Sequence, residues 1–435
     1  MDIIIILSLL LFVILIFSGV PVPFSFLGAI VFLVFVKDYN PGFLLPAGFA
    51  KLNSVTLLTL PFFIAAGYLM AGGSIARRLI NFINVLVGRI RGGLGVVAVV
   101  VSCVFGAISG AAASSVVTIG TVMIPQMEKY GYPRGYSTAL ISSAAVLSTM
   151  IPPSLAMIMF AFVTGESVAA CFLATVGPAL LLTTLFSIAN IIMVRKIPTI
   201  VITPKATISQ IVKDIGIQGR SAFGALLLPV IILGGIYGGI MTPTEAAASA
   251  IFYAIILNVF IYREMSFGKV MLLLRSSVCT TGTMMLMTFF AAILSRLYTM
   301  EQVPQQVSSM LLGITSNKNG LLLLINLFLI FTGMIVDELS GILLVTPLLY
   351  PVILKLGINP IHFAAIVGAN LGMGMMTPPM AGIMYIGARV GDVTIDKMFK
   401  TSMILIFFCS IPVVIITTFW PPLSLFLPNL LGFVR

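Results

Sequence analysis

Two long apolar segments of this chain are each interrupted by a pair of consecutive prolines. The pairs are Pro152–Pro153, in the stretch STMIPPS, and Pro378–Pro379, in the stretch GMGMMTPPM. Proline lacks the backbone N–H, and its ring clashes with the preceding helical turn, so a regular helix cannot run through either pair. Both segments must therefore be broken helices, and the fold must provide a place for the polar backbone groups that each break frees.

The surroundings of these breaks are apolar along nearly the whole chain. Only 8% of the 435 residues are charged and 60% are hydrophobic, whereas soluble domains carry roughly 25% charged residues. We therefore expect an all-α polytopic membrane protein. The first apolar run has no small-residue cleavage site, which favours a retained helix over a signal peptide. The ten candidate spans are 2–18, 24–37, 53–71, 135–163, 169–193, 221–238, 246–262, 270–295, 361–388 and 401–419.

Several other classes of protein do not fit this sequence. The net charge of +11 comes from basic residues at the ends of apolar segments, which is typical of the positive-inside pattern and not of a nucleic-acid surface. The single histidine, His362, cannot form a metal site. The stretch GAISG lacks the GxSxG spacing of a serine hydrolase, and no general base is available for Ser109. We expect no enzymatic activity and no cofactor.

Two further apolar regions have a polar or small-residue centre. Region 94–128 is centred on GAISGAAASS, and region 321–354 is centred on GMIVDELSG. Each arm is about 13 to 15 residues long, too short to cross a bilayer that needs about 20. Both regions are therefore expected to be re-entrant helical hairpins whose tips face protein or water.

The two halves of the chain match at a constant spacing. The proline pairs are 226 positions apart, and at this offset Ser114 meets Ser340 and Met150 meets Met376. The match holds without gaps from Phe63 to Pro153. We infer an internal repeat, with repeat one at 1–193, a connecting segment at 194–220 and repeat two at 221–435.

Charge indicates how the two repeats are oriented. Connections 71–93 and 194–220 are rich in Lys and Arg, whereas connection 297–319 carries only Glu301 and Lys318. The first two are therefore expected in the cytoplasm and the third outside. The hairpins then open to opposite sides, which defines an inverted-topology repeat and points to a secondary transporter. Segment 194–220 is a candidate for an interfacial amphipathic helix.

The proline pairs free carbonyl groups one turn earlier in each helix. Pro152 and Pro153 release the carbonyls of Ser148 and Thr149, and the second pair releases those of Gly374 and Met375. A free carbonyl at membrane depth is costly unless it is bound, and a sodium ion is one possible partner. The hairpin tips offer additional ligands for an ion or an anionic substrate: Ser109, Ser114, Ser115, Gly333, Asp337 and Ser340.

The two adjacent acids of the second tip, Asp337 and Glu338, have two possible explanations. An intramembrane carboxylate is commonly functional, but Asp337 is also well placed to cap the returning arm of the hairpin. Both roles are compatible. Elsewhere, the stretch TPTEAAA predicts a capping box, with Thr242 as the N-cap, Pro243 at the first helical position and Glu245 at the third.

Several long stretches of the chain resemble the large membrane subunit of tripartite ATP-independent periplasmic (TRAP) transporters. They are GAISGAAASSVVTIGTVMIPQMEKYGYPRG, IPPS, GGIYGGIMTPTEAAA and VDELSGILLVTPLLYPVILKLGINPIHFAAIVGANLGMGMMTPP. The resemblance implies sodium-driven uptake of an organic acid in the bacterial inner membrane by an elevator mechanism. It also implies two partners, a small four-helix membrane subunit and a periplasmic substrate-binding protein.

The resemblance also implies the ligands of two sodium ions, largely through backbone carbonyls. One site would use Ser109, Ser148, Ile151 and Pro153, and the other would use Gly333, Gly374, Thr377 and Met380. The candidate substrate-site residues are Ser114, Ser115, Asp337, Ser340 and Ser154. Many members of the family carry an acid in the first hairpin tip, where this chain has AAASSVV, so the substrate of dicarboxylate members does not transfer. The alternative is a stand-alone sodium/anion symporter of the divalent-anion type, whose tips would carry a Ser-Asn-Thr type sequence.

Overall fold

The computed structural model describes residues 2–201, 208–315, 317–378 and 380–433, and the regular elements in these ranges are all helices. Seven helices are long and apolar enough to cross a membrane, or up to nine if each of two bent helix pairs counts as one span. The all-α polytopic membrane fold expected from the sequence is confirmed. Pro379 and residues 202–207 of the connecting segment lie outside the described residues.

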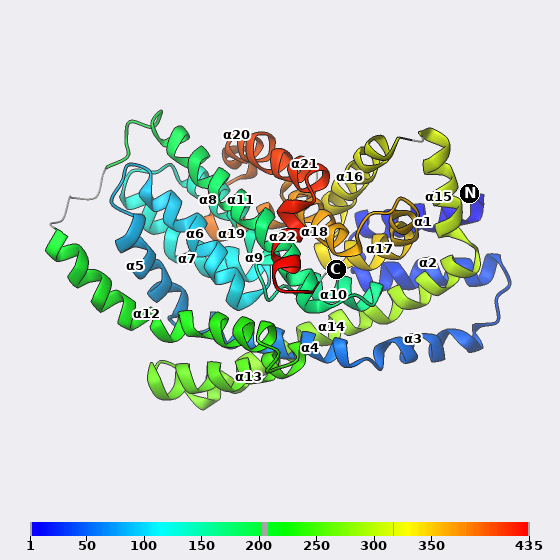
Figure 1. Cartoon of the computed structure of the whole chain (residues 1–435), viewed down its shortest axis with the longest axis horizontal. Helices are drawn as coiled ribbons and strands as arrows, with labels where there is room; N and C mark the ends of the chain where they lie inside the picture. The colour runs from blue at the N-terminus through cyan, green and yellow to red at the C-terminus, as the bar shows by residue number, and fades with distance from the viewer. Residues whose placement is uncertain (1, 202–207, 316, 379, 434–435) are drawn as a thin grey trace.

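One group of helices forms an elongated frame, and α3, α4, α12 and α13 of this group follow the lower edge of the molecule in Figure 1. The 34-residue helix α14 packs against α2, α3 and α4, and α13 lies along α4. The frame consists of α1 (Ile3–Phe17), α2 (Val22–Val36), η1 (Pro41–Phe43), α3 (Leu44–Leu52), α4 (Val55–Ala71), α5 (Ile75–Val87), α12 (Ile208–Tyr237), α13 (Pro243–Ile255), η2 (Ile256–Ile261), α14 (Phe267–Met300) and α15 (Val303–Ile314).

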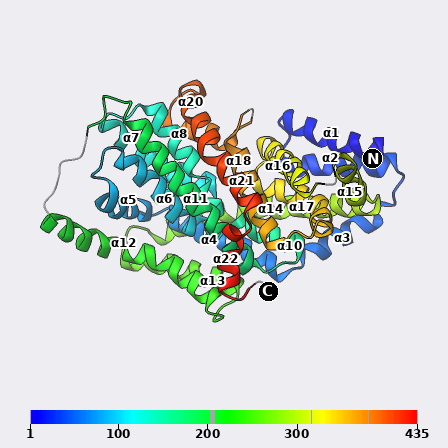
Figure 2. The same cartoon turned by 45° about the horizontal axis from the view of Figure 1, so that its top comes forward.

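The remaining helices form a core bundle beside the frame. Figure 2 shows α6, α7 and α8 at one end of this bundle, α16 and α17 at the other, and α18 and α21 between them. The core bundle consists of α6 (Gly93–Ser109), α7 (Ala112–Lys129), α8 (Arg134–Ala144), α9 (Leu147–Met150), α10 (Leu155–Thr164), α11 (Val168–Val194), α16 (Lys318–Ile335), α17 (Glu338–Lys355), α18 (Pro360–Met376), α19 (Gly382–Gly391), α20 (Ile395–Leu405), η3 (Ile406–Ser410), α21 (Ile411–Phe419) and α22 (Pro422–Leu430).

The helix boundaries repeat at the offset found in the sequence. Moving α7 by 226 positions reproduces both ends of α17, and moving the stretch from the start of α8 to the end of α9 reproduces both ends of α18. The left-handed residue after each hairpin is a glycine, Gly131 in the first repeat and Gly357 in the second. The structure therefore repeats the same hairpin and broken helix in both halves. The inverted orientation of the two repeats stays a prediction from charge.

The hairpins lie where the sequence places them, but the expected length of their arms was wrong. The tips are at residues 110–111 and 336–337, and the arms are 17 or 18 residues long. Eighteen helical residues span about 27 Å, close to the roughly 30 Å of a bilayer core. The arms are longer because each helix continues through the polar residues at the mouth of its hairpin, such as Lys129 and Lys355. Arm length alone therefore does not establish that the hairpins are re-entrant.

The connections between the apolar segments also contain helices. Connection 71–93 forms α5, and connection 297–319 forms α15. The later part of the connecting segment belongs to α12, which runs without a break from residue 208 through residue 220 to residue 237. An ion pair of 2.7 Å between Arg89 and Asp214 joins the segment that follows α5 to α12.

A cluster of ionisable side chains joins the ends of α1, α2 and α14. Lys37 Nζ lies 2.5 Å from a carboxylate oxygen of Asp2 and 3.0 Å from one of Glu301. Hydrogen bonds from Tyr39 and Lys37 hold the pKa of Glu301 below its ordinary value of 4.5. A hydrogen bond from Lys37 likewise lowers the pKa of Asp2 below 3.8. A carboxylate whose pKa is lowered by folding stabilises the fold above its ordinary pKa and loses that effect as the pH falls through the lowered value.

We expect Lys37→Met to lower the apparent Tm of the purified protein by about 1–2 °C at neutral pH, because the pairs are partly exposed and contribute modestly. The difference from the unmodified protein should shrink as the pH falls below 4.5, where the lowered carboxylate pKa values are crossed. Thermal unfolding in detergent between about pH 7 and pH 3 measures this, with Lys269→Met at an exposed position as the control. A difference that stays constant over this range would contradict the assignment.

Candidate functional site

The first broken helix opens at its proline pair as expected. Helix α9 ends at Met150, Ile151 is extended with φ −82° and ψ 128°, and the Pro152–Pro153 peptide bond is cis. Ser154 then caps α10, because its hydroxyl oxygen accepts the N–H of Met157 at 3.3 Å. The same hydroxyl donates to the carbonyl of Thr149. One of the two carbonyls expected to be free is therefore satisfied within the protein.

The second break begins in the same way, with an extended residue after the helix end, but the next helix has no side-chain cap. Helix α18 ends at Met376, and Thr377 is extended with φ −97° and ψ 128°. The Thr377 N–H donates to the carbonyl of Gly374, and its hydroxyl donates to the carbonyl of Met373, both at 2.8 Å. Helix α19 begins after Ala381, which is left-handed with φ 38°. A carbonyl oxygen has two lone pairs, so Gly374 retains one for a further ligand.

Close backbone contacts bring the first hairpin to the first break. A Cβ built on Gly106 would lie 2.5 Å from the Cα of Ser148, and a Cβ on Gly110 would lie 2.6 Å from the carbonyl oxygen of Pro153. Ser109 lies between these two glycines at the end of α6, and its buried hydroxyl has no hydrogen-bond partner. The structure therefore places the Ser109 segment against the segment that contains Ser148, Ile151 and Pro153.

The second hairpin approaches the second break in the same way. A Cβ on Gly374 would lie 2.6 Å from both the Cα and the carbonyl carbon of Gly333, and one on Gly333 would lie 2.8 Å from the carbonyl oxygen of Leu371. Helices α16 and α18 are therefore in backbone contact, which only small residues allow. Gly333 and Met380 also line a common cavity.

This cavity has a volume of about 370 Å³ and lies where the two hairpin tips and the two breaks meet. The tips contribute 110–113 and 333–339, and the breaks contribute Thr149, Leu155, Ala156, Met375, Met380, Gly382, Ile383 and Ile386. Met284 of the frame helix α14 completes the lining. Among the described residues, no Lys, Arg or His lines the cavity.

Of the five candidate substrate-site residues, only Asp337 lines the cavity. Asp337 is exposed and lines the cavity, and it also caps α17 by accepting the N–H of Ser340 at 3.3 Å. The capping role considered from the sequence is confirmed. Ser340 donates to Asp337 and contacts Met287 Sδ at 2.9 Å. Ser154 is the cap of α10. Ser114, Ser115, Ser154 and Ser340 do not contribute to the lining.

Two polar residues of the cavity were considered from the sequence but were not among the candidate substrate-site residues. They are Thr149, at the end of α9, and Glu338, the first residue of α17. Glu338 is adjacent to Asp337, and the pair of acids in an apolar region was a usable signal. The sequence did not show which of the two carboxyls is buried.

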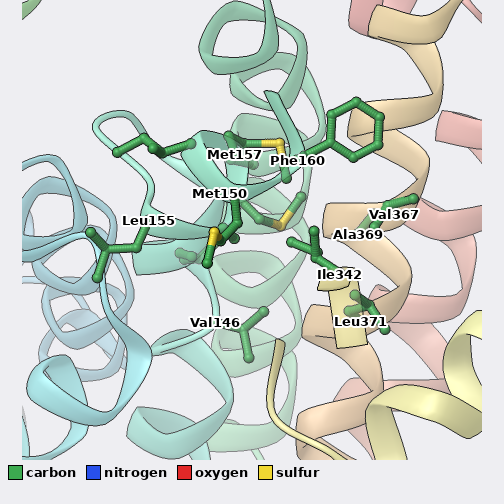
Figure 3. Close-up of a cluster of buried hydrophobic side chains, with 14 of the residues drawn as sticks. Val146, Met150, Leu155, Met157, Phe160, Ile342, Val367, Ala369 and Leu371 are labelled. Atoms are coloured by element: carbon green, nitrogen blue, oxygen red, sulfur yellow. The ribbon is translucent and has the colours of Figure 1, made fainter. Parts of the chain in front are cut away.

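Buried apolar contacts hold the two broken helices at a fixed separation. Figure 3 shows Val146, Met150, Met157 and Phe160 from the first repeat facing α18 of the second. The ring of Phe160 meets that of Phe363 edge-on, with centroids 6.0 Å apart. Because these side chains are almost fully buried, they resist separation of the two repeats.

Broken helices and hairpins that meet at a shared cavity define a membrane protein of the secondary-transporter class. Residues 9–423 match the family described as "Tripartite ATP-independent periplasmic transporter, DctM component", so the chain belongs to this family. It is the large permease subunit of an organic acid transporter and not an enzyme. Its family and its apolar helices make it a multi-pass protein of the bacterial inner membrane.

Three relatives extend this similarity over most of the chain. The protein "YgiK" of Salmonella typhimurium is 37% identical over 87% of this chain and 86% of its own length. The C4-dicarboxylate TRAP transporter large permease protein DctM of Pseudomonas aeruginosa is 34% identical over 93% of each chain. The isethionate TRAP transporter permease protein DctMQ of Oleidesulfovibrio alaskensis is 33% identical over 94% of this chain and 64% of its own length.

A solved structure supports the fold alone. The YdaH transporter of Alcanivorax borkumensis is similar with a TM-score of 0.60 at 14% identity, over 88% of each chain.

Proposed function

We propose that this chain imports an organic acid anion together with sodium ions, after a periplasmic substrate-binding protein has delivered the anion. The observation that carries this proposal is the meeting of two hairpin tips and two broken helices at one cavity of about 370 Å³. A cavity of this size accommodates a small organic anion. The helix N-termini at its wall offer N–H donors that favour negative charge.

The first proposed sodium site lies between the end of α6 and the first break. Its ligands are the Ser109 hydroxyl and carbonyl groups of Ser148, Ile151 and Pro153. The Ser109 hydroxyl supports this proposal because it is buried without a partner, a condition that costs free energy unless something binds it. A cation is a suitable partner, since a hydroxyl oxygen has lone pairs to offer.

The second proposed sodium site lies between the end of α16 and the second break. Its ligands are carbonyl groups of Gly333, Gly374, Thr377 and Met380. The backbone contact between Gly333 and Gly374 supports the proposal, because it leaves no side chain between these carbonyl-bearing segments. Both proposed sites adjoin the cavity, so sodium binding and substrate binding can influence each other.

An elevator mechanism is part of the proposal. The hairpins, the breaks and both proposed sodium sites belong to the core bundle, whereas Met284 belongs to the frame. The cavity therefore lies at the boundary between the two groups of helices. Movement of the core bundle along the frame would carry the cavity with it, from one side of the membrane to the other.

The proposed partners are a small four-helix membrane subunit and the substrate-binding protein. The DctMQ relative supports the first of these, because this chain accounts for 64% of its length. The remaining third of that relative is long enough to hold a further membrane subunit.

The deciding experiment is uptake into liposomes that contain this chain and a small membrane subunit of the same transporter, with its substrate-binding protein outside. We expect uptake of an organic acid that requires an inward sodium gradient and all three proteins. Uptake by this chain alone would favour the stand-alone symporter of the divalent-anion type. Uptake that does not respond to sodium would contradict the two sodium sites.

A further inference from the structure

Glu338 is a buried carboxyl group with one oxygen that has no hydrogen-bond partner. Its side chain is only 3% exposed, it lines the cavity, and its Oε1 atom accepts no hydrogen bond. The hydroxyl of Thr149, on the same cavity wall, donates to the carbonyl of Val146 at 2.9 Å and is therefore already used. Leaving a buried carboxyl unpaired is costly. Because no Lys, Arg or His among the described residues lines the cavity, a hydrogen-bond donor on a bound ligand is a suitable partner for the free oxygen of Glu338.

The tip of the first hairpin, which lines the same cavity, offers hydrogen-bond donors. Helix α7 begins after Ala111, which has no side-chain cap, and 111–113 line the cavity. The first N–H groups of a helix have no partner within it, so this tip presents donors where the second tip presents a carboxyl. At the equivalent end of α17, Asp337 already accepts an N–H. The two ends of the cavity therefore favour opposite ligand groups.

We propose that the substrate of this chain is a carboxylate that carries a hydrogen-bond donor, a hydroxyl or amino group, at its far end. This rests on the proposed function, because it assigns the cavity to the substrate. The N-terminus of α7 binds the carboxylate, and Glu338 accepts the hydrogen bond from the donor. A dicarboxylate of the same length has a carboxylate in place of the donor, so it leaves the free oxygen of Glu338 without a hydrogen bond and gains nothing from it.

Four acids of four carbons test this directly on the purified full-length chain in detergent with sodium. Butyrate has no donor, 4-hydroxybutyrate and 4-aminobutyrate each have one, and succinate has a second carboxylate. Titrations followed by thermal unfolding give apparent Kd values from ligand-induced stabilisation. We expect the two donor-bearing acids to bind about tenfold more tightly than butyrate, as one hydrogen bond to a carboxylate allows. Succinate should bind no better than butyrate.

Substitutions at Glu338 then assign the effect to this side chain. We expect Glu338→Met to abolish the preference for the donors, and Glu338→Gln to weaken 4-aminobutyrate more than 4-hydroxybutyrate, because Gln retains an acceptor but no charge. Glu128→Gln alters a surface carboxylate paired with Arg134 and should preserve the order of affinities. Because the comparison of acids is made on the unmodified chain, it does not depend on the variants folding.

The possible results distinguish a failure of the role proposed for Glu338 from a failure of the proposed function. Equal binding of butyrate and the donor-bearing acids, or a preference for succinate, would overturn the role of Glu338 and leave organic acid transport standing. No stabilisation by any of the four acids in sodium would overturn the assignment of this cavity to the substrate, and the role of Glu338 with it.

Discussion

Gly374→Ala is expected to reduce sodium-driven uptake to background. The added Cβ would lie 2.6 Å from the Gly333 backbone and 2.7 Å from the carbonyl oxygen of Ile330. Both neighbours are backbone, so neither can rotate away, and α16 must move from α18. Overpacking of this kind costs about 1–3 kcal/mol of stability. The larger effect is on transport, because the displacement separates the carbonyls proposed to bind sodium. Uptake into liposomes and thermal unfolding of the same preparation measure the two effects.

The matched control for this substitution is Gly282→Ala in α14. A Cβ at that position has no atom within 4 Å among the described residues, and alanine favours a helix over glycine by up to about 1 kcal/mol. We expect normal uptake and an equal or higher Tm. Gly106→Ala should behave like Gly374→Ala, since its Cβ would lie 2.5 Å from Ser148. Normal uptake by Gly374→Ala would show that close contact between α16 and α18 is not needed.

Ser109→Ala is expected to weaken sodium binding by about tenfold or more while leaving the fold intact without sodium. The Ser109 hydroxyl is buried and unpartnered, so removing it without sodium removes an unsatisfied group and costs little. With sodium bound, the same change removes a ligand. The stabilisation of the chain by sodium, measured as Tm against sodium concentration, should therefore shift to higher concentration.

Ser402→Ala is the control, because its hydroxyl is also buried and unpartnered but belongs to α20, which forms neither break and does not line the cavity. It should leave the sodium dependence unchanged. If Ser109→Ala lowers the Tm equally with and without sodium, the hydroxyl has a structural role and the first sodium site is wrongly placed.

The features that could be predicted from the sequence follow local rules. Consecutive prolines cannot continue a helix, so both breaks are found at their expected positions. The stretch TPTE predicts a capping box, and Thr242 and Glu245 form one. The offset of 226 positions is reproduced by the helix boundaries because each repeat carries the same breaks and turns. Helix ends were less predictable, because a helix extends through polar residues for as long as its backbone hydrogen bonds can be made.

The hydrogen-bond partners of single carbonyl groups, and the burial of single carboxyl groups, could not be predicted from the sequence. Pro153 was expected to leave the carbonyl of Thr149 free, but Ser154 donates to it from the far side of the break. That contact depends on the direction in which the chain leaves the proline pair. The burial of Glu338 and the exposure of Asp337 depend on how α17 faces the rest of the cavity.

The sequence by itself determined that this is a helical membrane protein with two repeated halves, two hairpins and two broken helices. Composition, proline chemistry and spacing act along the chain, so they can be read without knowing which segments meet. Only the tertiary structure decided that both tips and both breaks surround one cavity, and that one wall presents helix N–H groups while the other presents Glu338. The two tips at the cavity, 110–113 and 333–339, are more than 200 positions apart in the sequence. Within each repeat, close packing at glycines such as Gly106, Gly333 and Gly374 sets how the hairpin meets its broken helix.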